Sequence, residues 1–350
     1  MEPPLPIRLR SLHRAILTYG YGCAPPLILE QALRFGVFSQ LEQGPKSAAE
    51  ICAQCHASER GMTMILNALV GLGCLRKTNG VYRNVKGVTD IFTAAHDGEV
   101  DALIRKTGLE SNYFLMASKL TEKWLRLGDA VKTGTPVVRY DQEQTATEYF
   151  VEFAAAMFAN SFRAAHHFAQ KLRRSLMRED LKVLDLGAGS AAWSLPWALA
   201  SKSTHVRAVD WEAVIPLARD IATKLDVEAQ YTFTPGDLLG AELGIGFHLA
   251  FLGHVIHTEG ESRSRELIQR CFDALAPGGT IVIAEWVADD DRSAPAHVMV
   301  FAVTMLLVSE RGDAYSFAEI SGWLTDAGFR DVRKVQVPAP SPLIIATKPG

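Results

Sequence analysis

Val183-Leu184-Asp185-Leu186-Gly187-Ala188-Gly189-Ser190 is the stretch that decides the fold of this 350-residue chain. It is a short apolar run with an acid and two glycines, and a helix is predicted after it over Ala191–Ala200. This order predicts a buried parallel strand, a tight turn and a helix start. Glycine lets the backbone turn sharply and lets a ligand approach. Asp185 is expected at the carboxyl end of the strand, where open α/β sheets bind ligands.

Three more apolar segments end at polar residues in the same way. They are Val206–Val209 before Asp210-Trp211, Gln230–Phe233 before Gly236-Asp237-Leu238, and Leu249–Leu252 before Gly253-His254-Val255-Ile256-His257. Asp210 is placed to hold ribose hydroxyls, because it ends the second strand roughly 20 residues after the glycines. Asp237 is expected to accept a hydrogen bond from an adenine amino group, with Leu238 against the ring. Four such strand ends predict an adenosine pocket.

These motifs resemble the class I S-adenosylmethionine-dependent methyltransferases over nearly the whole chain. The closer resemblance is to small-molecule O-methyltransferases with an N-terminal dimerisation domain, the plant caffeate type and its bacterial relatives. It implies an α/β fold with a mostly parallel Rossmann-like sheet, a closing antiparallel hairpin and a preceding winged-helix dimerisation domain. It also implies S-adenosylmethionine as the cofactor. The expected cofactor-binding residues are Asp185, Gly187, Gly189, Asp210, Trp211, Gly236, Asp237, Leu238 and Gly253.

Composition is ordinary for a globular protein, with 48% hydrophobic and 21% charged residues. The formal net charge of −3 gives no basic field that would favour nucleic acid. No apolar run reaches the roughly 18 residues of a membrane span, and the first residues lack the apolar core of a signal peptide. We therefore expect a cytoplasmic enzyme with no membrane or nucleic-acid partner.

Residues 1–100 are predicted to form a winged-helix-like dimerisation domain. The expected elements are helices over Leu12–Phe38 (with a break near Pro25-Pro26), Ser47–Gln54 and Glu59–Leu72, and a hairpin around Thr78-Asn79-Gly80. Asn-Gly is a strong hairpin signal, and Glu50 stands at capping-box spacing from Ser47. The helix in the recognition position carries Arg60 as its only basic residue, so subunit contact is favoured over DNA binding. A homodimer is expected.

Residues 101–178 are predicted to be a helical connector that contributes to the acceptor pocket, and residues 179–350 the cofactor-binding domain. The connector is expected to hold long helices over Asp101–Leu127 and Glu148–Leu176, with a loop over Gly128–Gln144 between them. In the family the second helix also walls the acceptor pocket. Met157 and Phe158 are therefore candidates for substrate contact.

The resemblance makes His257 the general base, since a histidine after the fourth strand has that role in the family. Imidazole suits the task because its pKa lies near neutral. Glu285, after the fifth strand, stands where the family has a carboxylate that orients the base. A second carboxylate usually lies in a Glu-Arg-Thr sequence, but this chain has Ala314-Tyr315-Ser316 there. Further substrate candidates are His254, Tyr315, and Phe301 and Met305 on an apolar helix over Ala294–Val308.

No metal site is expected. Cys52-Ala53-Gln54-Cys55-His56 matches a haem-attachment pattern, but it falls within a predicted helix and favours packing cysteines. Asp289-Asp290-Asp291 is interpreted as a solvated loop. His166-His167 is interpreted as an exposed pair, because adjacent helix residues do not face one another.

Four functions remain open from the residues alone. The first is O-methylation of a small aromatic or polyketide-like hydroxyl. The second is methyl transfer to carbon or nitrogen on the same fold, and the third is an NAD-dependent oxidoreductase, since Gly187-x-Gly189-x-x-Ala192 loosely fits the dinucleotide fingerprint. The fourth is a non-methylating catalyst that binds the same cofactor. The methyl acceptor is not identified by the sequence, because pocket residues vary freely on one scaffold.

Overall fold

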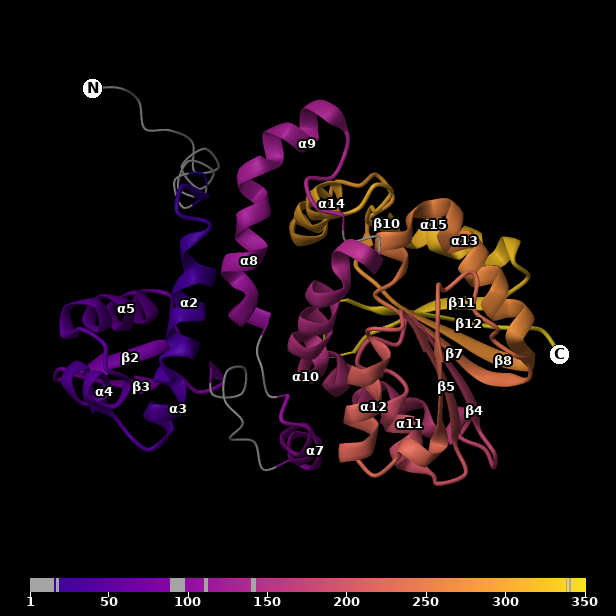
Figure 1. Cartoon of the computed structure of the whole chain (residues 1–350), viewed down its shortest axis with the longest axis horizontal. Helices are drawn as coiled ribbons and strands as arrows, with labels where there is room; N and C mark the ends of the chain where they lie inside the picture. The colour runs from indigo at the N-terminus through magenta and orange to yellow at the C-terminus, as the bar shows by residue number, and fades with distance from the viewer. Residues whose placement is uncertain are drawn as a thin grey trace, which may run out of the picture. The chain divides into compact units, whose positions relative to one another are not determined.

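The computed structural model describes residues 16, 19–88, 98–109, 113–139, 143–337, 339 and 341–350, with side chains from residue 148 onward in the helix that begins at Glu143. The chain forms two compact units (Figure 1). The small unit is Met1–Asp97 with Asn112–Glu122, and the large unit is Gly98–Ser111 with Lys123–Gly350. The domain boundaries predicted at residues 100 and 178 stay predictions.

The small unit packs short helices around a three-stranded antiparallel sheet of order β1-β3-β2. Its elements are α2 (Ala24–Arg34), α3 (Val37–Glu42), β1 (Lys46–Ser47), α4 (Ala48–Cys55), α5 (Glu59–Gly71), β2 (Leu75–Thr78), β3 (Val81–Asn84), η1 (Tyr113–Met116) and α8 (Ala117–Glu122). Pro25-Pro26 lie in the first turn of α2. Proline is tolerated there because that N–H has no partner in the helix, so the predicted break is the start of a helix. Residues 12–15, 17 and 18 of the predicted helix lie outside the described residues.

The hairpin and the capping box of the small unit are confirmed. Asn79 and Gly80 have φ of +50° and +81°, the left-handed conformation that a two-residue hairpin turn requires. They join β2 to β3, which pair from Thr78 opposite Val81. The Ser47 side chain accepts the N–H of Glu50, and the Glu50 carboxylate accepts the N–H of Ser47.

The large unit is built on a seven-stranded sheet of order β11-β12-β8-β7-β4-β5-β6. The strands are β4 (Lys182–Leu186), β5 (His205–Asp210), β6 (Tyr231–Pro235), β7 (Phe247–Gly253), β8 (Leu275–Ala284), β11 (Arg330–Val335) and β12 (Leu343–Thr347). The five strands from β8 to β6 pair in parallel. The last two, β12 and β11, are antiparallel, as the predicted closing hairpin requires.

Helices cover both faces of this sheet, because strand side chains alternate between two apolar cores. On one face Val183, Leu249 and Phe251 pack with the helices before and between the strands, and on the other Leu184, Ala250 and Leu252 pack with helices from the C-terminal half. The first group is α7 (Glu99–Thr107), α10 (Glu143–Leu176), α11 (Leu195–Ala200) and α12 (Ile215–Lys224), and the second is α13 (Ile256–Ala274) and α15 (Phe317–Asp326). Among the helices described, none has both the length and the apolar character of a membrane span.

The remaining elements of the large unit lie outside the seven-stranded sheet and its covering helices. They are η2 (Lys123–Arg126), α9 (Leu127–Thr133), η3 (Glu228–Gln230), β9 (Val287–Ala288), α14 (Ala296–Val308) and β10 (Tyr315–Ser316). The long helix predicted over Asp101–Leu127 is wrong, because α7 ends at Thr107 and is followed by Gly108, whose φ is +70°. The loop predicted over Gly128–Gln144 is partly wrong, since α9 continues to Thr133 and α10 starts at Glu143.

The helix predicted from Ala191 begins four residues later, at Leu195. Ala191 has a φ of +56°, which costs a residue with a Cβ roughly 1–2 kcal/mol. The Ala191 side chain is also fully buried. The turn after the glycines is therefore longer and tighter than the sequence pattern predicted.

Replacing Ala191 by valine is expected to lower the free energy of unfolding by roughly 2–5 kcal/mol. A β-branched side chain is poorly tolerated at positive φ, and extra methyl groups overpack a full core. Ala198→Val is the matched control, because Ala198 is buried in α11 at helical dihedrals and adds only overpacking, about 1–3 kcal/mol. Urea unfolding measures both variants. Equal losses would show that the backbone at Ala191 is unstrained.

Candidate functional site

The carboxyl ends of β7, β4, β5 and β6 lie side by side, because these strands are parallel neighbours in the sheet. Backbone bonds link the turns that follow them. The Gly187 N–H donates to the Val209 carbonyl at 2.9 Å, and the Gly236 N–H donates to the Asp210 carbonyl at 2.9 Å. The predicted cofactor residues that follow the four strands therefore meet at one edge of the sheet, where parallel α/β folds hold ligands.

The glycine turn fixes the carboxylate of Asp210. The Gly189 N–H donates to Asp210 Oδ2 and the Trp211 N–H to Oδ1, both at 2.7 Å. A Cβ on Gly187 would lie 2.5 Å from Val255 Cγ2, whereas a Cβ on Gly189 would meet nothing closer than 3.6 Å. Glycine is thus required at position 187 because a side chain would clash with Val255. A Cβ at Gly189 would meet no such clash. A fixed carboxylate at this strand end is the kind of acceptor that vicinal hydroxyls such as those of ribose can bind.

Asp237 and Leu238 lie in the turn after β6. Asp237 Oδ1 accepts the Leu239 N–H at 2.9 Å, and Oδ2 accepts Arg263 Nη2 at 3.0 Å. Leu238 is buried, with Cδ1 3.6 Å from the position of a Cβ on Gly187. Leu238 therefore packs beneath the glycine turn. Arg263 neutralises part of the negative charge of Asp237. An adenine amino group bound to Asp237 would therefore share this carboxylate with Arg263.

Asp185 lies inside the large unit. Its carboxyl is buried and accepts the Ser194 hydroxyl at 2.5 Å, and Ser194 Oγ is 3.2 Å from the Tyr231 hydroxyl. Burial raises the pKa of the Asp185 carboxyl to about 7, and the nearby charge of Asp210 adds to this. In this structure Asp185 ties β4 to the turn before α11.

Trp193 covers the end of β7. A Cβ on Gly253 would stand 2.3 Å from Trp193 Cδ1, so glycine is needed for the indole to lie there. The Trp193 ring centre is 6.3 Å from that of His254. Sequence reasoning did not single out Trp193, because its contact with β7 joins segments 60 residues apart.

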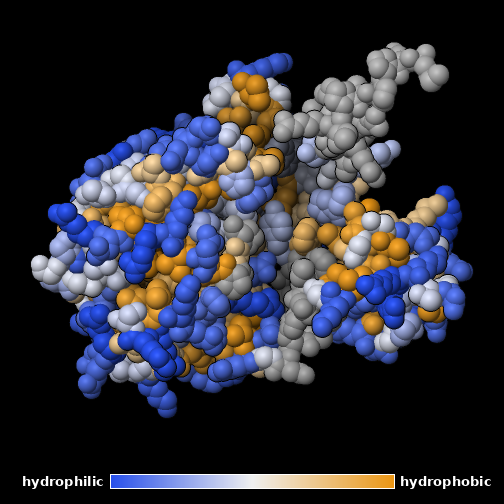
Figure 2. Space-filling model, turned by 180° about the vertical axis from the view of Figure 1, so that it is seen from behind, coloured by the Kyte–Doolittle hydropathy of each residue, from blue (hydrophilic) through white to orange (hydrophobic). Residues whose placement is uncertain are grey.

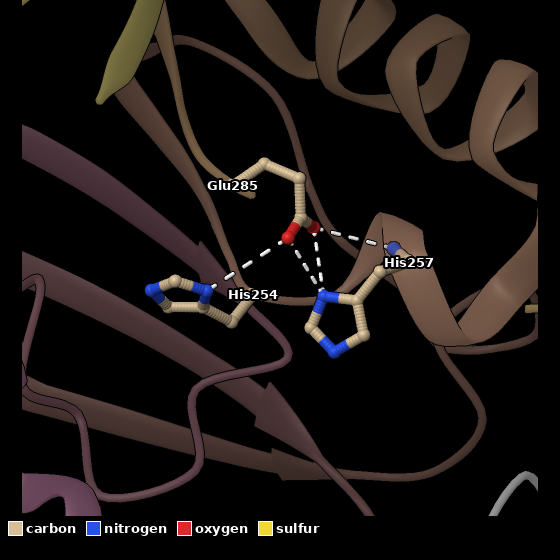
Figure 3. A group of neighbouring side chains, drawn as sticks. All are labelled: His254, His257 and Glu285. Carbon is tan, nitrogen blue, oxygen red and sulfur yellow. Dashed lines mark hydrogen bonds and ion pairs between the residues drawn. The ribbon is translucent and has the colours of Figure 1, made fainter. Parts of the chain in front are cut away.

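His257 and Glu285 form the chemical centre of this edge (Figure 3). His257 lies in the first turn of α13, and its Nδ1 is 2.8 and 2.9 Å from the two Glu285 oxygens. The His257 N–H also donates to Oε2 at 3.2 Å, and the Trp286 N–H donates to Oε1 at 2.8 Å. The Glu285 carboxylate therefore binds the Nδ1 edge of the ring, and His257 Nε2 points away from it (Figure 3).

Glu285 is ionised at neutral pH although its side chain is 0% exposed. Burial would raise the pKa of this carboxyl, but the charge of His257 and the contacts of both imidazoles outweigh burial and lower it to about 2. A fixed negative charge beside Nδ1 favours the tautomer with the proton on that atom.

His254 shares the same carboxylate at a longer distance. Its Nδ1 is 3.8 Å from Glu285 Oε1, and its Nε2 is 3.4 Å from the buried Ser341 hydroxyl. The φ of His254 is +60°, a conformation that costs a residue with a Cβ energy and clusters at functional sites. The imidazoles of His254 and His257 thus both lie next to the buried carboxylate of Glu285.

A backbone clamp holds the turn that carries His257. The Asp313 N–H donates to the His257 carbonyl at 2.9 Å, and the Ser309 hydroxyl donates to the Thr258 carbonyl at 2.8 Å. Ser309 Oγ also accepts the Gly312 N–H at 2.9 Å. Ala314, at the position of the missing second carboxylate, is buried among apolar side chains. The chain thus fixes the main chain of His257 close to the position where the resemblance implied a second carboxylate.

Aromatic rings line the other side of His257. Phe301 meets the imidazole edge-on at 4.9 Å between ring centres, and Trp286 lies 5.4 Å from Phe301 and 5.5 Å from His297. Phe301 and His297 belong to α14, where only His297 and Thr304 are polar. Trp286 and His297 were missed by sequence reasoning. The position of Trp286, directly after Glu285, is the signal that could have found it.

The other substrate candidates lie deeper. Phe158 is fully buried and stacks on Phe162 at 5.3 Å, Met305 is buried with Leu307, and Met157 is half-buried on α10. Tyr315 is buried with its ring 4.7 Å from that of Trp323. Phe158 and Tyr315 therefore serve packing in this structure.

A mostly parallel sheet with two closing antiparallel strands, a glycine turn and acidic strand ends defines the class I methyltransferases. The chain belongs to the O-methyltransferase family, enzymes that take a methyl group from S-adenosylmethionine. Residues 124–330 match the O-methyltransferase domain, and residues 19–88 match the O-methyltransferase dimerisation domain. The family gives no support to the nicotinamide alternative.

Similar proteins span nearly the whole chain. The chain is 31% identical over 333 residues, 92% of each protein, to the tetracenomycin polyketide synthesis 8-O-methyl transferase TcmO of Streptomyces glaucescens. It is 27% identical over 328 residues, 89% of this chain and 88% of the relative, to the 3-hydroxy-5-methyl-1-naphthoate 3-O-methyltransferase of Streptomyces sahachiroi. Human N-acetylserotonin methyltransferase, crystallised in complex with SAM, shares the fold at a TM-score of 0.75 and 22% identity over 100% of both chains.

Proposed function

We propose that this O-methyltransferase methylates the hydroxyl of a small aromatic or polyketide-like compound, with His257 as general base. The observation that carries the proposal is the 2.8 Å contact of His257 Nδ1 with the buried Glu285 carboxylate. It leaves Nε2 as the ring nitrogen that can take the hydroxyl proton. Glu285 holds the tautomer and stabilises the imidazolium that forms.

The cofactor supplies an electrophilic methyl group on a sulfonium. We assign its binding to the edge formed by Asp185, Gly187, Gly189, Asp210, Trp211, Gly236, Asp237, Leu238 and Gly253. Asp210 holds the ribose, since its carboxylate is fixed by two backbone N–H groups. The residues around His257 orient the acceptor oxygen and exclude water, and such positioning accounts for much of the rate of a transfer between two bound molecules.

Two observations support an aromatic acceptor. The rings of Trp286, Phe301 and His297 lie next to the base, and offset stacking or edge contacts suit flat aromatic molecules. The names of two similar proteins also give a polyketide pathway and a hydroxynaphthoate. We assign Phe301 and Trp286 to the acceptor wall, with Met157, Met305 and His254 as further contacts.

The test uses S-adenosylmethionine labelled with carbon-13 in the methyl group, with a panel of phenols, naphthols and polycyclic hydroxyketones. NMR of the product distinguishes a methyl on oxygen from one on carbon or nitrogen. An O-methyl signal and one equivalent of S-adenosylhomocysteine are the expected result. A C-methyl or N-methyl product would replace the O-methylation proposal. A product that carries no label would favour the non-methylating alternative.

Replacing Asp210 by alanine is expected to lower the affinity for S-adenosylmethionine by about 10- to 100-fold for each hydroxyl that loses its charged acceptor. Isothermal titration measures the change. Asp220→Ala is the matched control, because Asp220 is an exposed carboxylate of α12 that pairs with Lys224. Thermal melting without cofactor checks folding. An unchanged affinity would remove Asp210 from the site.

We also propose that the chain is a homodimer through residues 1–100, with 101–178 as the connector and 179–350 as the cofactor-binding domain. Apolar side chains reach the surface of the small unit (Figure 2). They include Tyr21 at 77%, Met64 at 55% and Leu72 at 42% exposure. These exposed apolar side chains lie in the region that matches the O-methyltransferase dimerisation domain, and they support a contact surface between subunits.

Met64→Glu with Leu72→Glu is expected to convert the dimer of two 38.3 kDa chains into a monomer. Two charges in an apolar contact would each remain unpaired and desolvated. Sedimentation velocity gives the mass. Ile245→Glu is the control, because Ile245 is an apolar residue of the large unit that is more exposed still, at 82%. A dimer that survives the double change would place the interface elsewhere.

A further inference from the structure

Three metal-ligand side chains converge beside the proposed base. One ring nitrogen of His254, one of His257 and a Glu285 oxygen all lie within 4.8 Å of one another. The two imidazoles come from the end of β7 and the start of α13, and the carboxylate follows β8. Figure 3 shows both Nδ1 atoms directed at the same carboxylate.

The Glu285 carboxylate hydrogen-bonds His257 Nδ1, whereas His254 Nδ1 lies only at ion-pair distance from it. Oε1 of Glu285 already accepts His257 Nδ1 and the Trp286 N–H, both at 2.8 Å. The 3.8 Å from His254 Nδ1 is longer than a hydrogen bond. Yet His254 is held at a φ of +60° with its Nε2 against Ser341. This resembles a metal-binding imidazole, whose second nitrogen is usually fixed by an outer partner.

We propose that His254, His257 and Glu285 form a binding site for a divalent transition-metal ion of the Zn²⁺ type, and that the bound ion inhibits methyl transfer. Two imidazole nitrogens and one carboxylate are a common ligand set for zinc, with a fourth position left for water. Tetrahedral zinc with bonds of about 2.0–2.1 Å separates its ligands by about 3.3–3.4 Å. The separations of 2.8 and 3.8 Å from Glu285 Oε1 to the two Nδ1 atoms bracket that value, and the ligand atoms of the three residues lie within 4.8 Å of one another. Side-chain rotations that bring the two imidazoles closer together would therefore close the site.

The bound ion would inhibit methyl transfer because it changes which nitrogen of His257 carries the proton. The inhibition rests on the proposed function of His257 as general base. A metal ion binds Nδ1 only after its proton has left. The remaining proton of the neutral ring is then on Nε2, so Nε2 can no longer accept the hydroxyl proton. The metal also takes the carboxylate that would stabilise an imidazolium.

Binding is tested with Co²⁺, whose visible absorption reports ligand geometry independently of activity. All proteins carry Cys52→Ser and Cys55→Ser, so that the thiols of α4 do not bind the probe. One equivalent of Co²⁺ is expected to give a tetrahedral spectrum, and Zn²⁺ is expected to displace it. Ser341→Ala should weaken binding by about 10-fold, as loss of an outer partner does, and His254→Gln should weaken it further. His167→Gln is the surface control.

The same spectrum and affinity in His254→Gln as in the parent would overturn the proposal, as would the absence of stoichiometric Co²⁺ binding. Methyl transfer is then measured in EDTA and with added Zn²⁺. Activity in EDTA that Zn²⁺ abolishes, and that EDTA restores, is the expected result. Co²⁺ binding without activity in EDTA would refute the proposed function and the inhibition but keep the metal site. Full activity with saturating Zn²⁺ would refute the inhibition.

Discussion

Replacing His257 by asparagine is expected to lower kcat by about 10²–10⁴-fold, the usual contribution of a general base. Asparagine keeps an N–H donor close to the position of Nδ1, so the buried Glu285 keeps a partner. It has no group that takes the proton at the position of Nε2. Affinity for S-adenosylmethionine should change little, because the proposed ribose contact is at Asp210. Single-turnover rates and isothermal titration measure the two quantities.

His167→Asn is the matched control for this change, since His167 is an exposed histidine of α10. Its kcat should equal that of the parent. A normal kcat in His257→Asn would mean that the base lies elsewhere or that the hydroxyl loses its proton without one. The pH profile separates these cases, because a rate carried by hydroxide or by an already ionised phenol rises with pH through the pKa of the acceptor.

Replacing Glu285 by glutamine is expected to reduce kcat by roughly 10³–10⁴-fold. Loss of the analogous acid in serine proteases costs about 10⁴-fold, because the imidazole takes the wrong tautomer. The glutamine side chain would be similar in size and still bind the Trp286 N–H. The fold should therefore persist while the orientation and charge of the base change. Turnover with saturating cofactor measures the loss, and a kcat within about threefold of the parent would contradict the role of Glu285.

The same substitution should change how stability depends on pH. The pKa of Glu285 is about 2 in the folded chain, below the 4.5 of a free glutamate. The ionised carboxylate therefore stabilises the fold above pH 4.5, and this contribution is lost as pH falls toward 2. The shift corresponds to about 3 kcal/mol. Urea unfolding at about pH 7 and about pH 3 should show a smaller loss on acidification in Glu285→Gln than in the parent.

The sheet was predictable from local patterns, and the pairing of His257 with Glu285 from the resemblance to the O-methyltransferases. Each parallel strand is a short apolar run that ends at glycine or an acid, and parallel neighbours bring those ends together. The contacts of Trp193 with Gly253 and of His254 with Glu285 were not predictable. They depend on side-chain directions between segments distant in sequence.

Backbone conformation explains the other departures. Ala191 adopts a dihedral that favours glycine, so α11 starts later than its residue pattern predicts. Gly108 ends a helix that propensity alone would have continued. The position of the missing second carboxylate was visible in the sequence at Ala314. The replacement, a clamp through Ser309 and Asp313, uses main-chain carbonyls that no side-chain pattern reveals.

The uniform apolar character of α14 has a consequence for evolvability. The helix brings Phe301 to the base, and nearly every residue around its axis is apolar. A substitution by another apolar residue, a slight rotation of α14 or a shift of α14 along its axis each exchanges one apolar side chain for another. None of these changes therefore leaves a buried polar group unpaired. With Phe301 in the proposed acceptor wall, we expect acceptor range to drift by single mutations on α14, while the pair of His257 and Glu285, bound by directional contacts, stays unchanged.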